Sequence, residues 1–128
     1  MSGQNKSAVW PKAEKAALIR KILDCIKQAG HHEQLKKGAK EATESVSRGT
    51  SKFIILAADT QPLSLVLPLL LLAEEKNVSY VFLPSKIAIG RACGISRPVI
   101  AVSITSNGSY DIDRKIRALR NKVKCLGT

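Results

Sequence analysis

The feature that most restricts the fold of this chain is one continuous apolar run, Phe53-Ile54-Ile55-Leu56-Ala57-Ala58, with polar residues on both sides. A strand that is solvated on one face alternates apolar and polar residues, whereas a strand covered on both faces is apolar throughout. The run therefore predicts a central strand with other elements packed on both of its faces.

Strand-like and helix-like segments alternate along the rest of the chain. Residues 78–83 and 98–105 are the other apolar strand segments, and Leu35-Lys36-Lys37 has the character of a short strand. Helical spacing and capping residues predict helices over 11–30, from near Gly38 to Gly49, over 62–76, from Ser85 to Cys93-Gly94, and from Asp111 or Asp113 onward, with a turn at 106–109. Strands alternating with helices imply a sheet between helix layers.

The segment from Leu63 to Ala73 is the most apolar of the predicted helices. It is much shorter than the ~20 residues of a membrane span, and it contains Ser64 and Pro68. We therefore expect a helix buried in the protein and no contact with a membrane. The chain of 128 residues fits one domain, which we place at 11–128 after a small, polar and flexible arm at 1–10.

The net charge of +11 predicts attraction to polyanions, which include RNA, DNA, acidic proteins and anionic membranes. Charge alone does not choose among them. Its distribution is more informative, because no acidic residue occurs between Glu75 and Asp111 although four basic residues do: Lys76, Lys86, Arg91 and Arg97. Such a segment offers phosphates a surface without competing carboxylates.

Cysteine and histidine usage argues against several classes of site. Cys25, Cys93 and Cys125 are far apart and odd in number, which fits neither a disulfide framework nor zinc spacing and favours a reducing compartment. Cys25 lies on the apolar face of its helix, as a core residue does. The pair His31-His32 has no partner at ligand spacing. The N-terminus lacks the apolar stretch of a signal peptide.

Catalytic patterns are also lacking. Gly90-Arg91-Ala92-Cys93-Gly94 has no lysine-serine/threonine ending of a phosphate-binding loop, so its glycines are expected to permit close packing and a helix end. Cys93 has no base tied to it, and no paired carboxylates suit acid–base chemistry. We expect no enzyme activity, no cofactor and no metal site.

The pattern that indicates a function is Leu35-Lys36-Lys37-Gly38-Ala39-Lys40-Glu41-Ala42-Thr43. Its lysines can meet phosphates, and Gly38 lets another backbone come close because it has no Cβ. The carboxylate of Glu41 can accept paired hydrogen bonds from a guanine edge. Ser85-Lys86 through Ile95-Ser96-Arg97-Pro98 reads as the second half of the same surface. Together these segments predict an RNA-binding module.

These segments also carry a resemblance to a known family. The chain resembles the kink-turn-binding family that includes archaeal box C/D core proteins and ribosomal relatives, in order over about residues 11 to 126. The loop Ser96-Arg97-Pro98 favours its eukaryotic branch of small nucleolar and spliceosomal proteins. The matching motifs are Gln34-Leu35-Lys36-Lys37-Gly38-Ala39, Glu41-Ala42-Thr43, Arg48-Gly49, Ala57-Ala58-Asp59, Asn77-Val78, Tyr80-Val81-Phe82, Ser85-Lys86, Gly90-Arg91-Ala92-Cys93-Gly94 and Ser96-Arg97-Pro98-Val99-Ile100-Ala101.

The resemblance implies a single-domain α/β fold, a three-layer α/β/α sandwich with a mixed, mostly four-stranded sheet. It implies that Glu41 reads a guanine of tandem sheared G·A pairs and that Lys37 and Lys86 hold phosphates. It also implies a pocket for a flipped-out pyrimidine, bordered by Leu65, Lys86, Ile95, Arg97 and Ile100. The full set of implied RNA-binding residues is Lys36, Lys37, Gly38, Lys40, Glu41, Gln61, Leu65, Lys86, Ile95, Ser96, Arg97 and Ile100.

Three positions depart from the pattern of the family. Lys40 replaces the usual asparagine and loses the acceptor of its amide. Glu44 replaces the usual lysine and places a second carboxylate three residues after Glu41, which weakens attraction for phosphate. Gln61 replaces a common glutamate and keeps hydrogen bonding. We therefore expect binding with altered affinity or a narrower choice of RNA.

The resemblance implies a non-catalytic protein that recognises kink-turns and nucleates assembly of box C/D small nucleolar particles, spliceosomal particles or both. Its implied partners are box C/D small nucleolar, spliceosomal or ribosomal RNA with a kink-turn, together with core proteins that dock on the complex. A monomer in the nucleus and nucleolus is expected. Two alternatives remain open at this point: a ribosomal or H/ACA protein of the same fold, and a protein-interaction adaptor with a decayed RNA surface.

Overall fold

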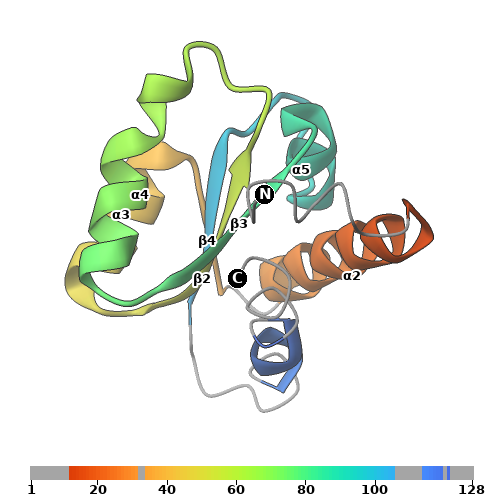
Figure 1. Cartoon of the computed structure of the whole chain (residues 1–128), viewed down its shortest axis with the longest axis horizontal. Coiled ribbons are helices and arrows are strands. Elements are labelled where there is room, and N and C mark those ends of the chain that lie inside the picture. The colour runs from red at the N-terminus through yellow and green to blue at the C-terminus, as the bar shows by residue number, and fades with distance from the viewer. Residues whose placement is uncertain (1–11, 32–33, 106–113, 120, 122–128) are drawn as a thin grey trace, which may run out of the picture.

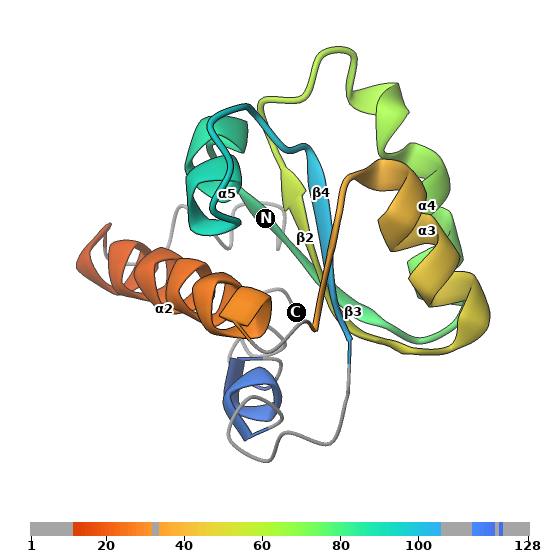
Figure 2. The same cartoon turned by 180° about the vertical axis from the view of Figure 1, so that it is seen from behind.

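The computed structural model describes residues 12–31, 34–105, 114–119 and 121. A sheet runs through the middle of the molecule, with two helices against one face and two against the other, and a further helical segment at 114–119 lies below them (Figures 1 and 2). The elements follow in the order α2 (Lys12–His31), β1 (Leu35–Lys37), α3 (Ala39–Arg48), β2 (Ser51–Ala57), η2 (Leu63–Leu65), α4 (Leu67–Glu75), β3 (Ser79–Leu83), α5 (Lys86–Ala92) and β4 (Ala101–Thr105).

The sheet is mixed and has four strands in the order β1-β4-β2-β3. Strand β2 pairs parallel to β3 and antiparallel to β4, and β4 pairs antiparallel to β1. Helices α3 and α4 cover one face, and α2 and α5 the other (Figure 1). The predicted three-layer sandwich is therefore confirmed.

Strand β2 is the central strand that the apolar run predicts. It lies between β4 and β3, and all of its residues except Lys52 are buried. Phe53 and Ile55 pack in the cluster beneath α2 and α5, whereas Ile54 and Leu56 pack in the cluster beneath α3 and α4. Each such side chain contributes about 1.5–3 kcal/mol when it leaves water, so this one strand stabilises both helix layers.

A buried chain of hydroxyls fixes α3 against the sheet. The Oγ atom of Ser103 on β4 lies 2.7 Å from that of Ser45 on α3 and 2.7 Å from that of Ser51 on β2. Ser45 also donates to the carbonyl of Ala42 at 2.8 Å. Buried hydroxyls need such partners to offset the loss of water, so these three serines specify where α3 sits.

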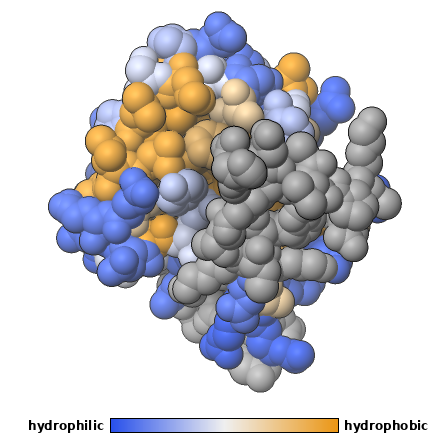
Figure 3. Space-filling view, in the orientation of Figure 1, coloured by the Kyte–Doolittle hydropathy of each residue, from blue (hydrophilic) through white to orange (hydrophobic). Residues whose placement is uncertain are grey.

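The single buried helix expected over 62–76 is wrong in two respects. The segment is divided into η2 and α4, because Pro68 is tolerated only in the first turn of a helix, where no i−4 carbonyl is displaced. It is also buried on one side only: Leu69 and Ala73 face the sheet, whereas Leu67 and Leu71 are 47% and 67% exposed. The exposed leucines form part of an apolar surface over η2 and α4 (Figure 3).

The strand expected over 98–105 begins later, at Ala101. Pro98 has no N–H for a ladder, and the Val99 amide donates to the carbonyl of Lys86 at 3.1 Å instead. The segment before β4 therefore packs against α5. Gly90 makes this possible, since a Cβ at that position would lie 2.1 Å from the Arg97 carbonyl oxygen. The close packing predicted for this glycine is confirmed, and Gly94 ends the helix with a φ of 82°.

Cys25 and Cys93 are both buried in the cluster beneath α2 and α5. Burial raises the pKa of the Cys25 thiol from 9.0 to about 11, and burial likewise raises the pKa of Cys93 to about 11. Nearby lysines, Lys115 and Lys37 respectively, oppose these shifts but do not overcome them. Both side chains are protonated core residues at neutral pH.

Several predicted features lie outside the described residues: the arm at 1–10, Pro11, the turn at 106–109, the caps Asp111 and Asp113, and Cys125. Within the last predicted helix, Ile116 and Leu119 are described and buried. Among the helices in the described parts of the chain, none has the length and apolar character needed to cross a bilayer.

Replacing Gly90 with alanine should destabilise the fold by about 1–3 kcal/mol, because a backbone carbonyl has to move to admit the new methyl group. Gly30→Ala is the matched control. Its Cβ would meet only Leu35 Cδ2 at 3.6 Å, so it should change stability by less than about 1 kcal/mol and in the favourable direction. Urea unfolding of both variants measures the difference. Equal urea midpoints for Gly90→Ala and Gly30→Ala would contradict the tight contact at Gly90.

The two buried thiols should react slowly with iodoacetamide in the native protein at pH 8 and quickly in denaturant. Between pH 9 and 11 the unfolded chain loses thiol protons that the folded chain keeps, so the free energy of unfolding should fall as pH rises through this window. Peptide mass spectrometry reports alkylation at each cysteine separately. Native-state labelling of Cys25 or Cys93 at the denatured rate would show that their burial is not maintained.

Candidate nucleic-acid interface

Four segments that are far apart in the sequence meet at one end of the sheet. The Gly38 amide donates to the Ala101 carbonyl at 2.8 Å, which places the end of β1 beside the start of β4. The Ala57 amide donates to Ile100 at 2.9 Å, which brings the end of β2 to the same point. The Lys86 amide donates to Oδ1 of Asp59 at 3.0 Å and adds the start of α5. The two halves predicted from the sequence therefore lie together.

Gly38 is the N-cap of α3 and has a φ of 101° and a ψ of 154°. L-residues with a side chain rarely adopt this conformation, so glycine is required by the backbone. A Cβ built there meets nothing within 4 Å, so the space in front of it is open. The first amides of α3 have no carbonyl partner within the helix, and with the positive end of the helix dipole they form an anion-binding end.

The neighbouring lysines of β1 point to opposite faces of the sheet, because side chains alternate along a strand. Leu35 packs against the cluster beneath α2 and α5. Lys37 lies two residues further on and shares that face, and its charge acts to lower the pKa of the Cys93 thiol. Lys36 instead borders a hollow on the α3 side. The two cations therefore flank Gly38 from different sides and do not form one patch.

The hollow on the α3 side has a volume of about 270 Å³ and is lined by Lys36, Glu41, Glu44, Ser45, Arg48 and Thr50. Glu41 is exposed in the first turn of α3, as expected for a residue that accepts from a ligand. Lys40 is also exposed. The predicted pair of carboxylates, Glu41 and Glu44, does share this surface.

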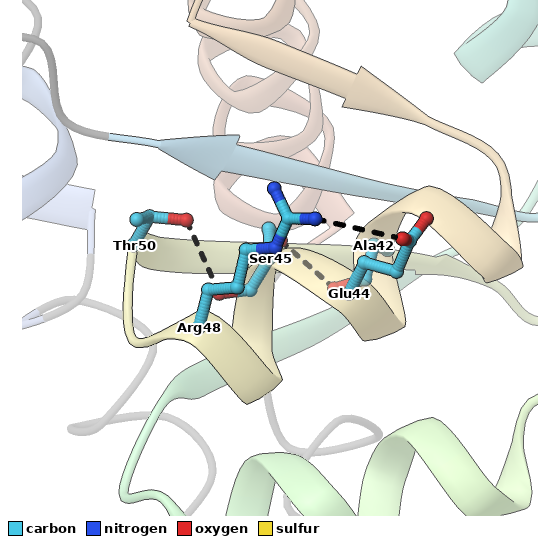
Figure 4. Close-up of polar contacts among 5 residues, drawn as sticks. All are labelled: Ala42, Glu44, Ser45, Arg48 and Thr50. Atoms are coloured by element: carbon cyan, nitrogen blue, oxygen red, sulfur yellow. Dashed lines mark hydrogen bonds and ion pairs between the residues drawn. The ribbon is translucent and has the colours of Figure 1, made fainter.

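Arg48 modifies the charge of that hollow. Its guanidinium lies 3.9 Å from the Glu44 carboxylate, one helical turn away, and the two side chains are 76% and 55% exposed (Figure 4). Pairs at this exposure contribute little to stability. Their effect here is on charge: Glu44 is partly neutralised, and the carboxylate of Glu41 remains available. Thr50 closes the C-terminal end of α3 by donating to the Ser45 carbonyl at 3.2 Å.

The start of α5 is held by two caps. The Ser85 side chain accepts from the Ala88 amide at 3.1 Å, which confirms the predicted N-cap. The carboxylate of Asp59 accepts from Lys86 and ties the segment after β2 to this helix. Lys86 is half-buried, so its backbone is fixed while its ammonium group stays in reach of solvent.

The remaining predicted residues are distributed over two places. Gln61 and Leu65 lie before and in η2, both exposed, and Leu65 is 54% exposed. Ile95, Ser96 and Arg97 line a groove of about 630 Å³ beside α5. Lys86, Leu65 and Ile100 are not among the residues that line it, and Ile100 packs partly into the core. Of the five residues expected to border the pyrimidine pocket, Ile95 and Arg97 line this groove.

Sequence reasoning gave no role to three residues near the predicted site: Asp59, which bonds the Lys86 amide, Arg48, which pairs with Glu44, and Ile87, which lines the groove together with Arg91. The i, i+4 spacing of Glu44 and Arg48 is a recognisable signal for a helix ion pair. Within the described residues no group of three or more His, Cys, Asp or Glu side chains lies close enough together to hold a metal ion.

Comparisons with known proteins agree with this fold. The sequence matches the model of the "Ribosomal protein L7Ae/L30e/S12e/Gadd45 family" over residues 20–113. A "13 kDa ribonucleoprotein-associated protein" from Saccharomyces cerevisiae is 53% identical over 126 residues, 98% of each chain. The protein of the same name from Candida albicans is 52% identical over the same share.

A solved structure gives the same result in three dimensions. The "Giardia lamblia 15.5kD RNA binding protein" superposes with a TM-score of 0.81 at 37% sequence identity, over 86% of this chain and 90% of that one. The family model covers well over half of the sequence, and the relatives match from end to end. The chain belongs to the L7Ae/L30e/S12e/Gadd45 family of ribosomal proteins.

Proposed function

We propose that this protein is a non-catalytic RNA-binding protein that recognises kink-turns. One observation carries the proposal: the glycine-capped start of α3 and the segment before β4 meet at one end of the sheet through the Gly38–Ala101 hydrogen bond. Relatives named for ribonucleoprotein association and RNA binding support the same class of ligand. The net charge of +11 suits a polyanion.

The geometry suits a bent RNA better than a regular duplex. The major groove of A-form RNA is too deep and narrow for side chains to read, and a sharp bend opens it. The start of α3 then presents its amides and Lys37 to the backbone, while Glu41 accepts from the guanines of the sheared G·A pairs. The flipped-out pyrimidine is received by the five residues that the family resemblance implies: Leu65, Lys86, Ile95, Arg97 and Ile100.

Binding of this kind stabilises one RNA conformation. A protein with affinity for the bent state and little for the extended state shifts the population toward the bent state. We infer that the fixed bend then provides a platform for other core proteins of box C/D small nucleolar or spliceosomal particles. We accordingly propose that the protein acts in the nucleus and nucleolus and that any particle chemistry belongs to a partner.

The hollow beside α3 bears on the choice of RNA. Its lining carries two carboxylates, Glu41 and Glu44, and two cations, Lys36 and Arg48, so its formal charges balance. A phosphate backbone that approaches this side therefore gains no net attraction from the hollow. The phosphates are therefore held mainly by Lys37, beside Gly38, and by Lys86 at the start of α5, which restricts the protein to RNAs that place their phosphates there.

Glu41→Ala should weaken binding to a standard kink-turn by about 1–3 kcal/mol, because it removes a base-reading contact. Glu75→Ala is a matched control, since Glu75 is an exposed carboxylate on α4 and lies outside the site. Fluorescence anisotropy with a kink-turn RNA, and with a duplex that lacks the G·A pairs, separates base reading from general attraction. If Glu41→Ala and Glu75→Ala bound alike, the role of Glu41 would be wrong.

Glu44→Lys should widen the choice of RNA. The change removes a carboxylate beside Glu41 and adds a cation, so each phosphate newly contacted should steepen the dependence of log affinity on log salt by about 0.7–0.9. Glu74→Lys is the matched control, because Glu74 is exposed on α4 and the substitution makes the same change in net charge. Gel shifts of both variants against a kink-turn and its terminal-loop form supply the measurement. Equal, tight binding of both RNAs by the unmodified protein would refute the restriction, and a flat salt response would favour an adaptor that binds acidic proteins.

A further inference from the structure

A groove beside α5 shares Ile95 and Arg97 with the RNA contacts proposed above and extends beyond them. It has a volume of about 630 Å³, within the range of ligand-binding sites, and it is lined by Ile87, Arg91, Gly94, Ile95, Ser96, Arg97 and Pro98. Ile87 and Arg91 are one helical turn apart and exposed, and Ile87 is 51% exposed. The opposite wall is the segment that runs from α5 to β4.

The groove is built into the fold. The Ile95 amide donates to Gly90 at 3.0 Å and the Val99 amide donates to Lys86 at 3.1 Å, so the segment is bonded to α5 near both ends. Between these bonds the Arg97 carbonyl lies where a Cβ of Gly90 would be, and only glycine allows this approach. The two walls are therefore held in place before any ligand arrives, which lowers the entropy cost of binding.

The lining combines two chemistries. Ile87, Ile95 and Pro98 supply apolar surface, and Arg91 and Arg97 supply guanidinium groups. Among the described residues that line the groove, none carries a carboxylate. An unpaired nucleotide has the matching parts: a flat base that packs on apolar side chains or on a guanidinium plane, and a phosphate that takes charge-assisted hydrogen bonds.

We propose that this groove binds an unpaired nucleotide of the RNA chain beyond the kink-turn contact. The inference rests on the proposed function, because Ile95 and Arg97 belong both to the groove and to the residues proposed to meet the flipped-out pyrimidine. The shared residues make the groove continuous with that contact. The base lies against Ile87 and Ile95, and Arg91 holds the phosphate.

The test uses two RNAs and three variants of the full chain. One RNA is a standard kink-turn, and the other has its unpaired strand lengthened by two uridines next to the flipped-out pyrimidine. Arg91→Ala removes the proposed phosphate contact and Ile87→Ser the proposed apolar wall. Lys52→Ala is the control, because Lys52 is an exposed cation at the other end of β2. Affinity is measured by anisotropy over a salt series.

The unmodified protein should bind the lengthened RNA more tightly, with a salt slope about 0.7 steeper than for the standard RNA. Arg91→Ala should remove that difference, and Ile87→Ser should weaken only the lengthened RNA, by roughly threefold or more. Lys52→Ala should leave the difference intact.

Equal affinity of the unmodified protein for the two RNAs, or an equal loss in both RNAs on Arg91→Ala, would overturn the groove assignment. A polyglutamate peptide that binds in an Arg91-dependent way while neither RNA responds would assign the groove to an acidic protein and also overturn it. Failure of the unmodified protein to bind the standard kink-turn would instead count against the proposed function.

Discussion

The pairing of β4 with both β1 and β2 is the constraint on which the arrangement of this molecule depends. Because β4 is antiparallel to each neighbour, its first residue lies beside the last residues of both. The segment that enters β4 therefore meets Gly38 on one side and the end of β2 on the other, through the amides of Gly38 and Ala57. Strand β3 runs parallel to β2 and delivers Ser85 and Lys86 to the same end. The pairing of the strands thus brings four loops to one end of the sheet. Proteins with α/β folds commonly bind ligands where strand ends meet.

Much of this fold is predictable from local patterns. The two-sided burial of β2, the Ser85 cap and the close approach at Gly90 each follow from a short stretch of sequence whose physical meaning is nearly unique. The position of η2 and α4 is harder to predict from local patterns. A run of leucines is compatible with a helix buried on all sides and with a helix packed on one side only. The number of neighbouring elements decides between these two possibilities. In this fold α4 contacts the sheet and α3, which leaves Leu67 and Leu71 outside.

For the candidate site, too, some features are predictable from local sequence patterns and others are not. The pairing of Lys36-Lys37-Gly38 with the segment before β4 was expected from a family resemblance, and the register supplies its physical cause. The separation of Lys36 from Lys37 follows from strand alternation once β1 is known to be a strand of the sheet. The contact of Asp59 with the Lys86 amide joins residues 27 apart and depends on the parallel pairing of β2 and β3. No local pattern specifies that contact, so it required the structure.

Glycine placement explains why the polar surface at this end is already formed in the free protein. At Gly38 the backbone conformation excludes other residues and the space ahead is empty, so the helix start is open to a ligand. At Gly90 the space that a Cβ would occupy is instead filled by the backbone of Arg97, so only glycine fits at this position. The first glycine leaves room for a ligand, and the second holds one wall of the groove against α5. Under the function proposed above, such a surface would hold a bent strand on two sides without rearranging its own backbone, and the energy of binding would go into bending the RNA.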